Sequence, residues 1–183
     1  MNIIKNLVKN FGSRNGTIPD VIVVHISAGS LTSMTSWFST PNSQASAHYG
    51  ISKNGTILQY VSESDKAWTQ GNVNNPTSEI ILSRPGVNPN LYCLSIENEG
   101  LDLQQAPQLQ IDTLCALIKD IATRNQIPLD RKHIIGHFEI DSKNRPFCPS
   151  PKHSIMDSIV ARLQEEDLVS VPRKLIEEIS KYL

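Results

Sequence analysis

The stretch that decides the fold is Val21-Ile22-Val23-Val24-His25-Ile26. It is short and almost continuously apolar, and it lies between Pro19-Asp20 and Ala28-Gly29-Ser30. A run of this length without polar alternation is typical of a strand that is buried on both faces, as in a parallel sheet covered by helices. The sequence therefore predicts an α/β fold in which His25 lies at the end of a buried strand.

Further elements surround this strand. Ser30 is suited to cap a helix that Pro41 ends. Residues 48–52 and 56–61 flank an Asn-Gly pair, which predicts a β-hairpin. Residues 91–97 and 133–137 predict two more strands, residues 67–91 predict mostly loop, and apolar residues at three- and four-residue intervals predict a long helix after Pro107 and another around Ile155 and Ile159. We therefore expect one domain with a central mixed β-sheet flanked by helices.

Length and composition limit the possible functions. The chain has 183 residues, 39% of them hydrophobic and 19% charged, which suits one globular domain. Its 17 Lys and Arg against 18 Asp and Glu give a net charge of −1. Nucleic acid is therefore not an expected partner, because nonspecific phosphate binding needs a surplus of positive charge. The longest aliphatic run is residues 21–24, so we expect no membrane insertion.

The two ends of the chain are expected to differ from its centre. We predict an N-terminal extension with a short helix over residues 1–19, a catalytic domain over 20–164 and a C-terminal helical extension over 165–183. The first residues lack the apolar core of a signal peptide, which predicts initial residence in the cytoplasm. The C-terminal helix would begin near Ser170 and carry an apolar stripe. It would either close the core or form a homo-oligomer.

Three side chains could bind zinc. His25 and His137 end predicted strands, and Cys148 lies in a turn-rich loop eleven residues beyond His137. Catalytic zinc takes three protein ligands and keeps one position open, whereas structural sites usually have four ligands. Two histidines and one thiolate from distant segments fit the catalytic pattern. Alternatively, each histidine could simply satisfy backbone groups at the end of its strand. The other cysteines, Cys93 and Cys115, lie in apolar patterns typical of buried thiols.

Glu97 is a candidate general base. The segment Cys93-Leu94-Ser95-Ile96-Glu97 places a carboxylate at the end of an apolar strand. Near a metal, such a group can accept a proton from water. The alternative is an acidic side chain on the surface. Glu99 shares the exposure but lies in a predicted loop, so it ranks lower.

Six short motifs in order resemble one family, the zinc-dependent N-acetylmuramoyl-L-alanine amidases of the amidase-2, peptidoglycan-recognition-protein-like type. The resemblance extends from about residue 20 to residue 163. The motifs are Val-Ile-Val-Val-His25, Ser46-Ala47-His48-Tyr49-Gly50-Ile51 with Asn54-Gly55, Ala67-Trp68, Leu94-Ser95-Ile96-Glu97, Ile135-Gly136-His137 and Cys148-Pro149.

This resemblance implies a function and a site. It implies Zn²⁺ held by His25, His137 and Cys148, with Glu97 polarising the attacking water and Trp68 contacting substrate. The substrate would be peptidoglycan, and the bond would be the amide between N-acetylmuramic acid and L-alanine. We expect a phage or prophage endolysin that stays cytoplasmic until it is released to the cell wall. A cytosolic muropeptide-recycling amidase is the alternative with the same chemistry.

The sequence departs from the family pattern at two positions. Some members have a tyrosine immediately before the position of His48, where this chain has Ala47. Members often have a lysine two residues before the last ligand, where this chain has Pro146. Lys143 or Arg145 could take the place of that lysine. Glu97 is therefore expected to carry more of the catalysis.

Two other classes of protein remain open at this stage. A metal-free cysteine peptidase could use Cys148 with His137, which would require the thiol near a helix N-terminus. A non-catalytic wall-binding protein would typically lack the cysteine ligand, and Cys148 is present.

Overall fold

The computed structural model describes residues 1–149, 155–156 and 158–163. Their main feature is a mixed six-stranded sheet in which only the β4–β5 pair is antiparallel. This confirms the predicted α/β class. In spatial order the strands are β1 (Ile3–Lys5), β5 (Ile57–Gln59), β4 (Tyr49–Ile51), β7 (Cys93–Asn98), β3 (Val21–Ile26) and β8 (Ile134–Gly136).

The strand β3 lies inside the sheet, with β7 on one side and β8 on the other. All six of its residues are buried, as its apolar sequence predicts. Because side chains alternate along a strand, Ile22, Val24 and Ile26 pack on one face, while Val21 and Val23 pack on the other. The parity of His25 places it on the same face as Val21 and Val23.

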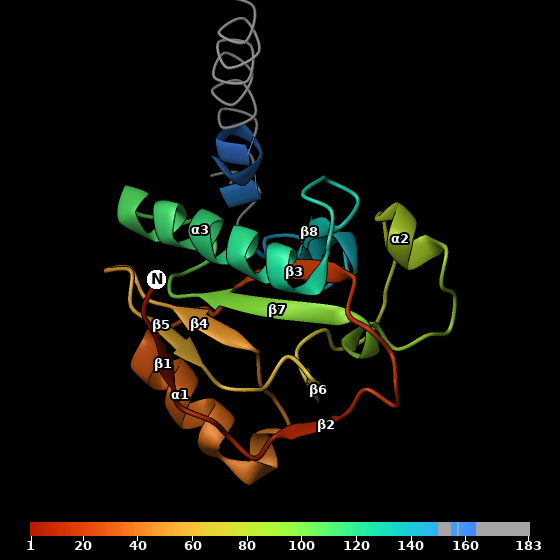
Figure 1. Cartoon of the computed structure of the whole chain (residues 1–183), viewed down its shortest axis with the longest axis horizontal. Coiled ribbons are helices and arrows are strands. Elements are labelled where there is room, and N and C mark those ends of the chain that lie inside the picture. Colours follow the sequence, from red (N-terminus) through yellow and green to blue (C-terminus); the bar gives the residue numbers. More distant parts are fainter. Residues whose placement is uncertain (150–154, 157, 164–183) are drawn as a thin grey trace, which may run out of the picture.

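Helices cover the sheet unequally (Figure 1). The long helix α3 (Gln108–Asn125) lies along one face and contributes seven residues to the main hydrophobic core, more than any other element. The helix α1 (Leu31–Ser39) packs with residues of the β4–β5 hairpin in a separate cluster, and the side chain of Ser30 caps it as predicted. The short helix α2 (Glu79–Leu82) lies within the expected loop. Single-turn 3₁₀ helices span Pro41–Ser43 (η1), Pro89–Leu91 (η2) and His137–Glu139 (η3).

The prediction of a short helix within residues 1–19 is wrong. The strand β1 is parallel to β5 at the edge of the main sheet, and β2 (Phe11–Ser13) pairs with β6 (Asp65–Ala67) in a two-stranded sheet. The adjacent β-branched residues Ile3 and Ile4 favour a strand. The chain beyond β1 continues alongside β5, because the Asn6 amide donates to the Gln59 carbonyl in β5 and the Val8 amide donates to the Tyr60 carbonyl just after it.

The last part of the described chain returns to the main core. Residues 155–156 and 158–163 are helical, and Ile155 and Ile159 are buried in the same cluster as α3. The predicted helical extension over 165–183, and the homo-oligomer that it could form, lie outside the described residues. Within the part of the chain that is described, no helix is both long and apolar enough to cross a membrane.

Candidate active site

The site is built where three neighbouring parallel strands end. In the register of β3 with β7, His25 lies opposite Glu97, so both side chains leave the same face of the sheet. His137 directly follows β8, the strand on the other side of β3. Ligand sites in open α/β sheets lie at the carboxyl ends of the strands. The topology therefore brings His25, Glu97 and His137, which are far apart in the sequence, to one edge of the sheet.

Cys148 reaches the site from a loop. Its thiol lies close to the end of β3, because the Ile26 amide donates to Sγ over 3.3 Å. Its carbonyl accepts from the Phe138 amide over 2.7 Å, next to His137. A Cβ at Gly136 would lie 2.6 Å from the Phe138 ring and 2.9 Å from Pro149, so only glycine permits this close packing. The loop is therefore fixed against the end of β3 and the turn that follows β8.

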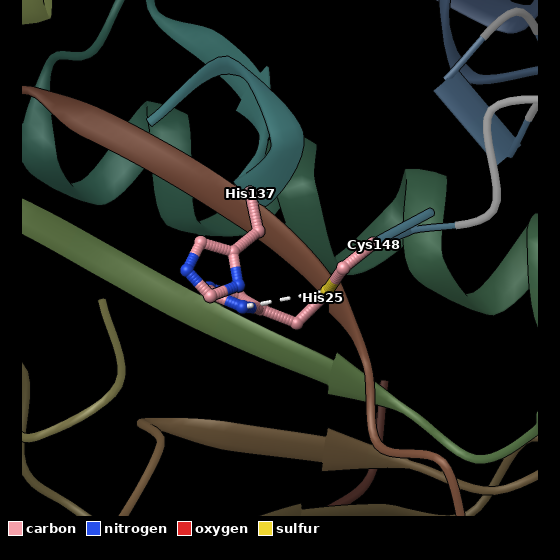
Figure 2. Close-up of side chains that lie close together, drawn as sticks. All are labelled: His25, His137 and Cys148. Atoms are coloured by element: carbon pink, nitrogen blue, oxygen red, sulfur yellow. Dashed lines mark hydrogen bonds between the residues drawn. The ribbon is translucent and has the colours of Figure 1, made fainter. Parts of the chain in front are cut away.

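Four candidate side chains lie close together. The ligand atoms of His25, His137 and Cys148 all lie within 4.8 Å of one another (Figure 2). Nδ1 of His25 is 3.9 Å from Sγ of Cys148 and 4.0 Å from Oε1 of Glu97. The centroids of the two imidazole rings are 4.4 Å apart. The predicted ligands and the predicted base thus share one small volume.

Burial governs the protonation of these groups. Desolvation raises the pKa of Glu97 to about 8, although the charge of Arg145 partly opposes the shift. Desolvation lowers the pKa of His137 to about 4 and, together with His137, holds the pKa of His25 well below its usual range. Desolvation also raises the pKa of the Cys148 thiol. The histidines are therefore neutral and each keeps a lone pair that can coordinate a metal.

The residues fit a zinc ion. Oε2 of Glu97 is buried without a hydrogen-bond partner among the described residues, although most buried polar atoms in folded proteins are paired. Two nitrogens and one sulfur are the donor set that Zn²⁺ accepts in catalytic sites. Ligand atoms at tetrahedral zinc lie roughly 3.3–3.8 Å apart, since zinc–ligand bonds are about 2.0–2.3 Å long. The separations here need only small side-chain movements to reach that geometry.

A groove of about 580 Å³ gives access to this centre. Glu97 and the three candidate ligands line it together with Trp68, so it contains every site residue that the sequence predicted. Trp68 follows β6, and its amide donates to the Ser46 hydroxyl over 3.0 Å, which fixes the backbone there. Of the two basic residues considered in place of the family's lysine, Arg145 lines the groove and Lys143 does not.

Other groove residues were not found from the sequence. Trp37 on α1 is 57% exposed and lines the groove, while Met34 and Phe38 on the same helix are buried. The spacing of residues 34, 37 and 38 could not separate these roles, because all three lie near one helix face. Asp102 also lines the groove, and no motif marked it.

Comparisons with known proteins identify the family of this chain. Residues 15–151 match the amidase-2 family, described as N-acetylmuramoyl-L-alanine amidase. N-acetylmuramoyl-L-alanine amidase A of Achromobacter lyticus is 29% identical over 109 residues, which are 58% of this chain and 52% of that protein. This chain therefore matches about half the length of that curated relative.

Solved structures share the fold. A selenomethionine derivative of AmpD superposes with a TM-score of 0.71 at 21% identity, over 87% of this chain and 93% of that chain. A mutant endolysin from Bacillus subtilis gives a TM-score of 0.63 at 17% identity, over 88% and 97%. Because the family pattern covers residues 15–151, which are most of the sequence, this chain belongs to the amidase-2 family, described as N-acetylmuramoyl-L-alanine amidase.

Proposed function

We propose that this protein is a zinc-dependent peptidoglycan amidase that hydrolyses the amide between N-acetylmuramic acid and L-alanine. The observation that carries the proposal is the position of the buried Glu97 carboxylate beside a His25–His137–Cys148 cluster in an accessible groove. Membership of the amidase-2 family supports the same reaction. His25, His137 and Cys148 would hold the metal, and Glu97 would act on the water.

Amide hydrolysis needs a strong nucleophile and stabilisation of charge on the carbonyl oxygen. Zinc, when bound, supplies both by lowering the pKa of water towards about 7 and by polarising the carbonyl. Glu97 would accept a proton from the attacking water and pass it to the departing amine of L-alanine. Its Oε2 has no partner among the described residues and is therefore available for this transfer.

The surrounding residues support the proton transfer. Burial alone favours the protonated form of Glu97, and the positive charge of Arg145 acts in the opposite direction. A cation bound by the three ligands would further favour the carboxylate. Trp68 would contact the substrate from the groove wall, because an aromatic ring offers a large apolar face to a sugar or peptide.

The proposal is tested by incubating purified cell walls with the protein. Amidase action releases new amino groups without new reducing sugars, and a chelator should stop it. Reducing ends without amines would indicate a glycosidase instead. Full activity after zinc removal would favour a cysteine peptidase that uses Cys148 and His137.

Glu97→Gln separates catalysis from metal binding. We expect it to lower kcat by about 10²–10⁴-fold, the usual contribution of a positioned base, while zinc remains bound. Glu99→Gln is the matched control, since Glu99 lies two residues away and its carboxylate accepts from the Lys53 amide outside the groove. A fully active Glu97→Gln variant would show that the base has been assigned wrongly.

We further propose that the enzyme is a phage or prophage endolysin, in which case it should release fragments from intact, cross-linked sacculi. The recycling alternative predicts that soluble muropeptides are cleaved and sacculi are not. Parallel assays on both substrates with the same enzyme preparation distinguish the two roles.

A further inference from the structure

Gln70 is a fully buried polar residue next to both candidate zinc-binding histidines. It follows Trp68 in the loop after β6, and its side chain has no solvent exposure. Its backbone carbonyl lies 3.1 Å from Nε2 of His137. A carbonyl can only accept, so Nε2 of His137 must carry the hydrogen. The lone pair of the neutral ring is then on Nδ1, which leaves that atom to coordinate the metal.

For His25, too, the question is which ring nitrogen carries the hydrogen and which one faces the metal. Its Nδ1 faces Cys148 and Glu97, at 3.9 Å and 4.0 Å. Its Nε2 and the side-chain oxygen Oε1 of Gln70 are both buried without a hydrogen-bond partner among the described residues. The Gln70 side chain lies beside this end of β3, because Ser95, whose hydroxyl accepts from it, pairs with Val23 in the register of β3 and β7, two residues before His25 on the same face. Nε2 of His25 can donate a hydrogen bond, and Oε1 of Gln70 can accept it.

Gln70 is held firmly enough to direct these rings. Its Nε2 donates to the Ser95 hydroxyl over 2.8 Å, and its backbone amide donates to the Asn90 side chain over 3.0 Å. Because Nε2 is already used, Oε1 is the atom that remains to accept. Ser95 lies on β7, two residues before Glu97, so the amide is fixed to the strand that carries the base.

We propose that Gln70 is a positioning residue that orients both histidines with Nδ1 towards the metal. Its backbone carbonyl accepts from His137 Nε2–H, and its side-chain Oε1 accepts from His25 Nε2–H. Figure 2 shows the two rings side by side with Cys148, as such an arrangement requires. The inference rests on the proposed zinc site. Hydrogen-bond partners of metal-bound histidines fix the tautomer and ring orientation, and their loss typically weakens metal affinity by about 10–100-fold.

The test compares two buried glutamines. Gln70→Met removes the acceptor while keeping the side-chain length, and we expect the Kd for Zn²⁺, measured by competition with a chromogenic chelator, to rise about 10–100-fold. Gln110→Met is the matched control, because Gln110 is also buried, also donates through Nε2, and also has an unpartnered Oε1, but it lies on α3 away from the groove. That variant should bind zinc as the wild type does.

A second variant and a spectroscopic measurement complete the test. Gln70→Glu keeps an acceptor oxygen and should bind zinc more tightly than Gln70→Met. In zinc-loaded wild type, long-range ¹H–¹⁵N NMR of the imidazoles should show His25 and His137 both protonated at Nε2. An Nδ1-protonated ring, or an unchanged Kd in Gln70→Met, would overturn the inference. Failure of the wild type to bind zinc would instead overturn the proposed function.

Discussion

The buried histidines of the described chain are of two kinds, His48 on the one hand and the pair His25 and His137 on the other, and they differ in how their ring nitrogens are satisfied. His48, fully buried, accepts from the Ser95 amide at Nδ1 over 3.0 Å, and its Nε2 lies 2.8 Å from Arg14 Nη2 and 3.1 Å from the Asp65 carbonyl. His25 and His137 are equally inaccessible, but their Nδ1 atoms have no hydrogen-bonding oxygen or nitrogen partner among the described residues. The protein alone satisfies His48, whereas His25 and His137 each keep a ring nitrogen that is available to a ligand.

This difference shows that burial alone does not identify a metal site. Desolvation lowers the pKa of His48 to about 3, so it is as strongly perturbed as the candidate ligands. What separates the groups is the count of partners, since a buried imidazole with both nitrogens occupied has no lone pair to offer. The groups also share a residue. Ser95 bonds His48 through its amide and Gln70 through its hydroxyl, so the satisfied cluster supports the other one.

The largest expected effect comes from removing a ligand. Cys148→Ala should weaken zinc binding by more than the ~100-fold that follows loss of an outer partner, and activity should fall with it. Unfolding followed by circular dichroism gives a second readout. Zinc at 100 times its Kd should stabilise the wild type by about 2.7 kcal/mol, and the variant should not respond at that concentration.

Cys93→Ala is the control for that substitution. Cys93 is also buried and carries a thiol whose pKa burial raises, but it lies at the start of β7, far from the ends that form the site. It should keep full zinc affinity. Equal responses of both variants to zinc would contradict the assignment of Cys148 as a ligand.

An intermediate effect is expected from His48→Ala. Loss of the ring would leave the Ser95 amide without its acceptor and open a cavity, and each buried group left unsatisfied costs about 1–3 kcal/mol. We expect a loss of about 3 kcal/mol in the free energy of unfolding, measured in urea, with zinc affinity changed less than in Gln70→Met. A zinc affinity that fell as far as in Cys148→Ala would remove the distinction between the two groups.

The effect of His48→Ala on the free energy of unfolding should also depend on pH. The folded-state pKa of His48 lies below its unfolded value of 6.5, because burial and the charge of Arg14 disfavour the protonated ring. Its contribution to stability is therefore fully present above about pH 6.5 and is lost as the pH falls towards about 3. The difference in unfolding free energy between wild type and His48→Ala should shrink over that range.

The sequence predicted much of this arrangement. The continuous apolar run of β3, the Asn-Gly hairpin and the Ser30 cap are local signals, and each element formed where expected. The structure also brings the candidate ligands and base into one groove, since each ends an apolar strand or lies in a turn-rich loop beside one.

Other features depend on long-range pairing. The edge strand β1 is recruited by β5, more than fifty residues away, and neither segment alone indicates that contact. The position of Gln70 beside two histidines depends on the register of β7 and the path of a loop without periodicity. The exposure of Trp37 could not be separated from the burial of Phe38 by helical spacing, because both lie near one face.

The smallest expected effect concerns a third kind of histidine. His133 lies before β8 and its Nδ1 is 2.7 Å from a carboxylate oxygen of Asp130, which is 51% exposed. We expect His133→Ala to lower the free energy of unfolding by no more than ~1 kcal/mol, because such pairs are screened by solvent, and to leave zinc affinity unchanged.

Partial burial raises the pKa of Asp130, but hydrogen bonds from His133 outweigh it and lower the pKa. The contribution of the pair is therefore present above the unfolded value of about 3.9 and is lost as the pH falls below it. Urea denaturation at pH 7 and pH 3 measures this, and a loss at pH 7 as large as that of His48→Ala would show that partner count does not rank the histidines.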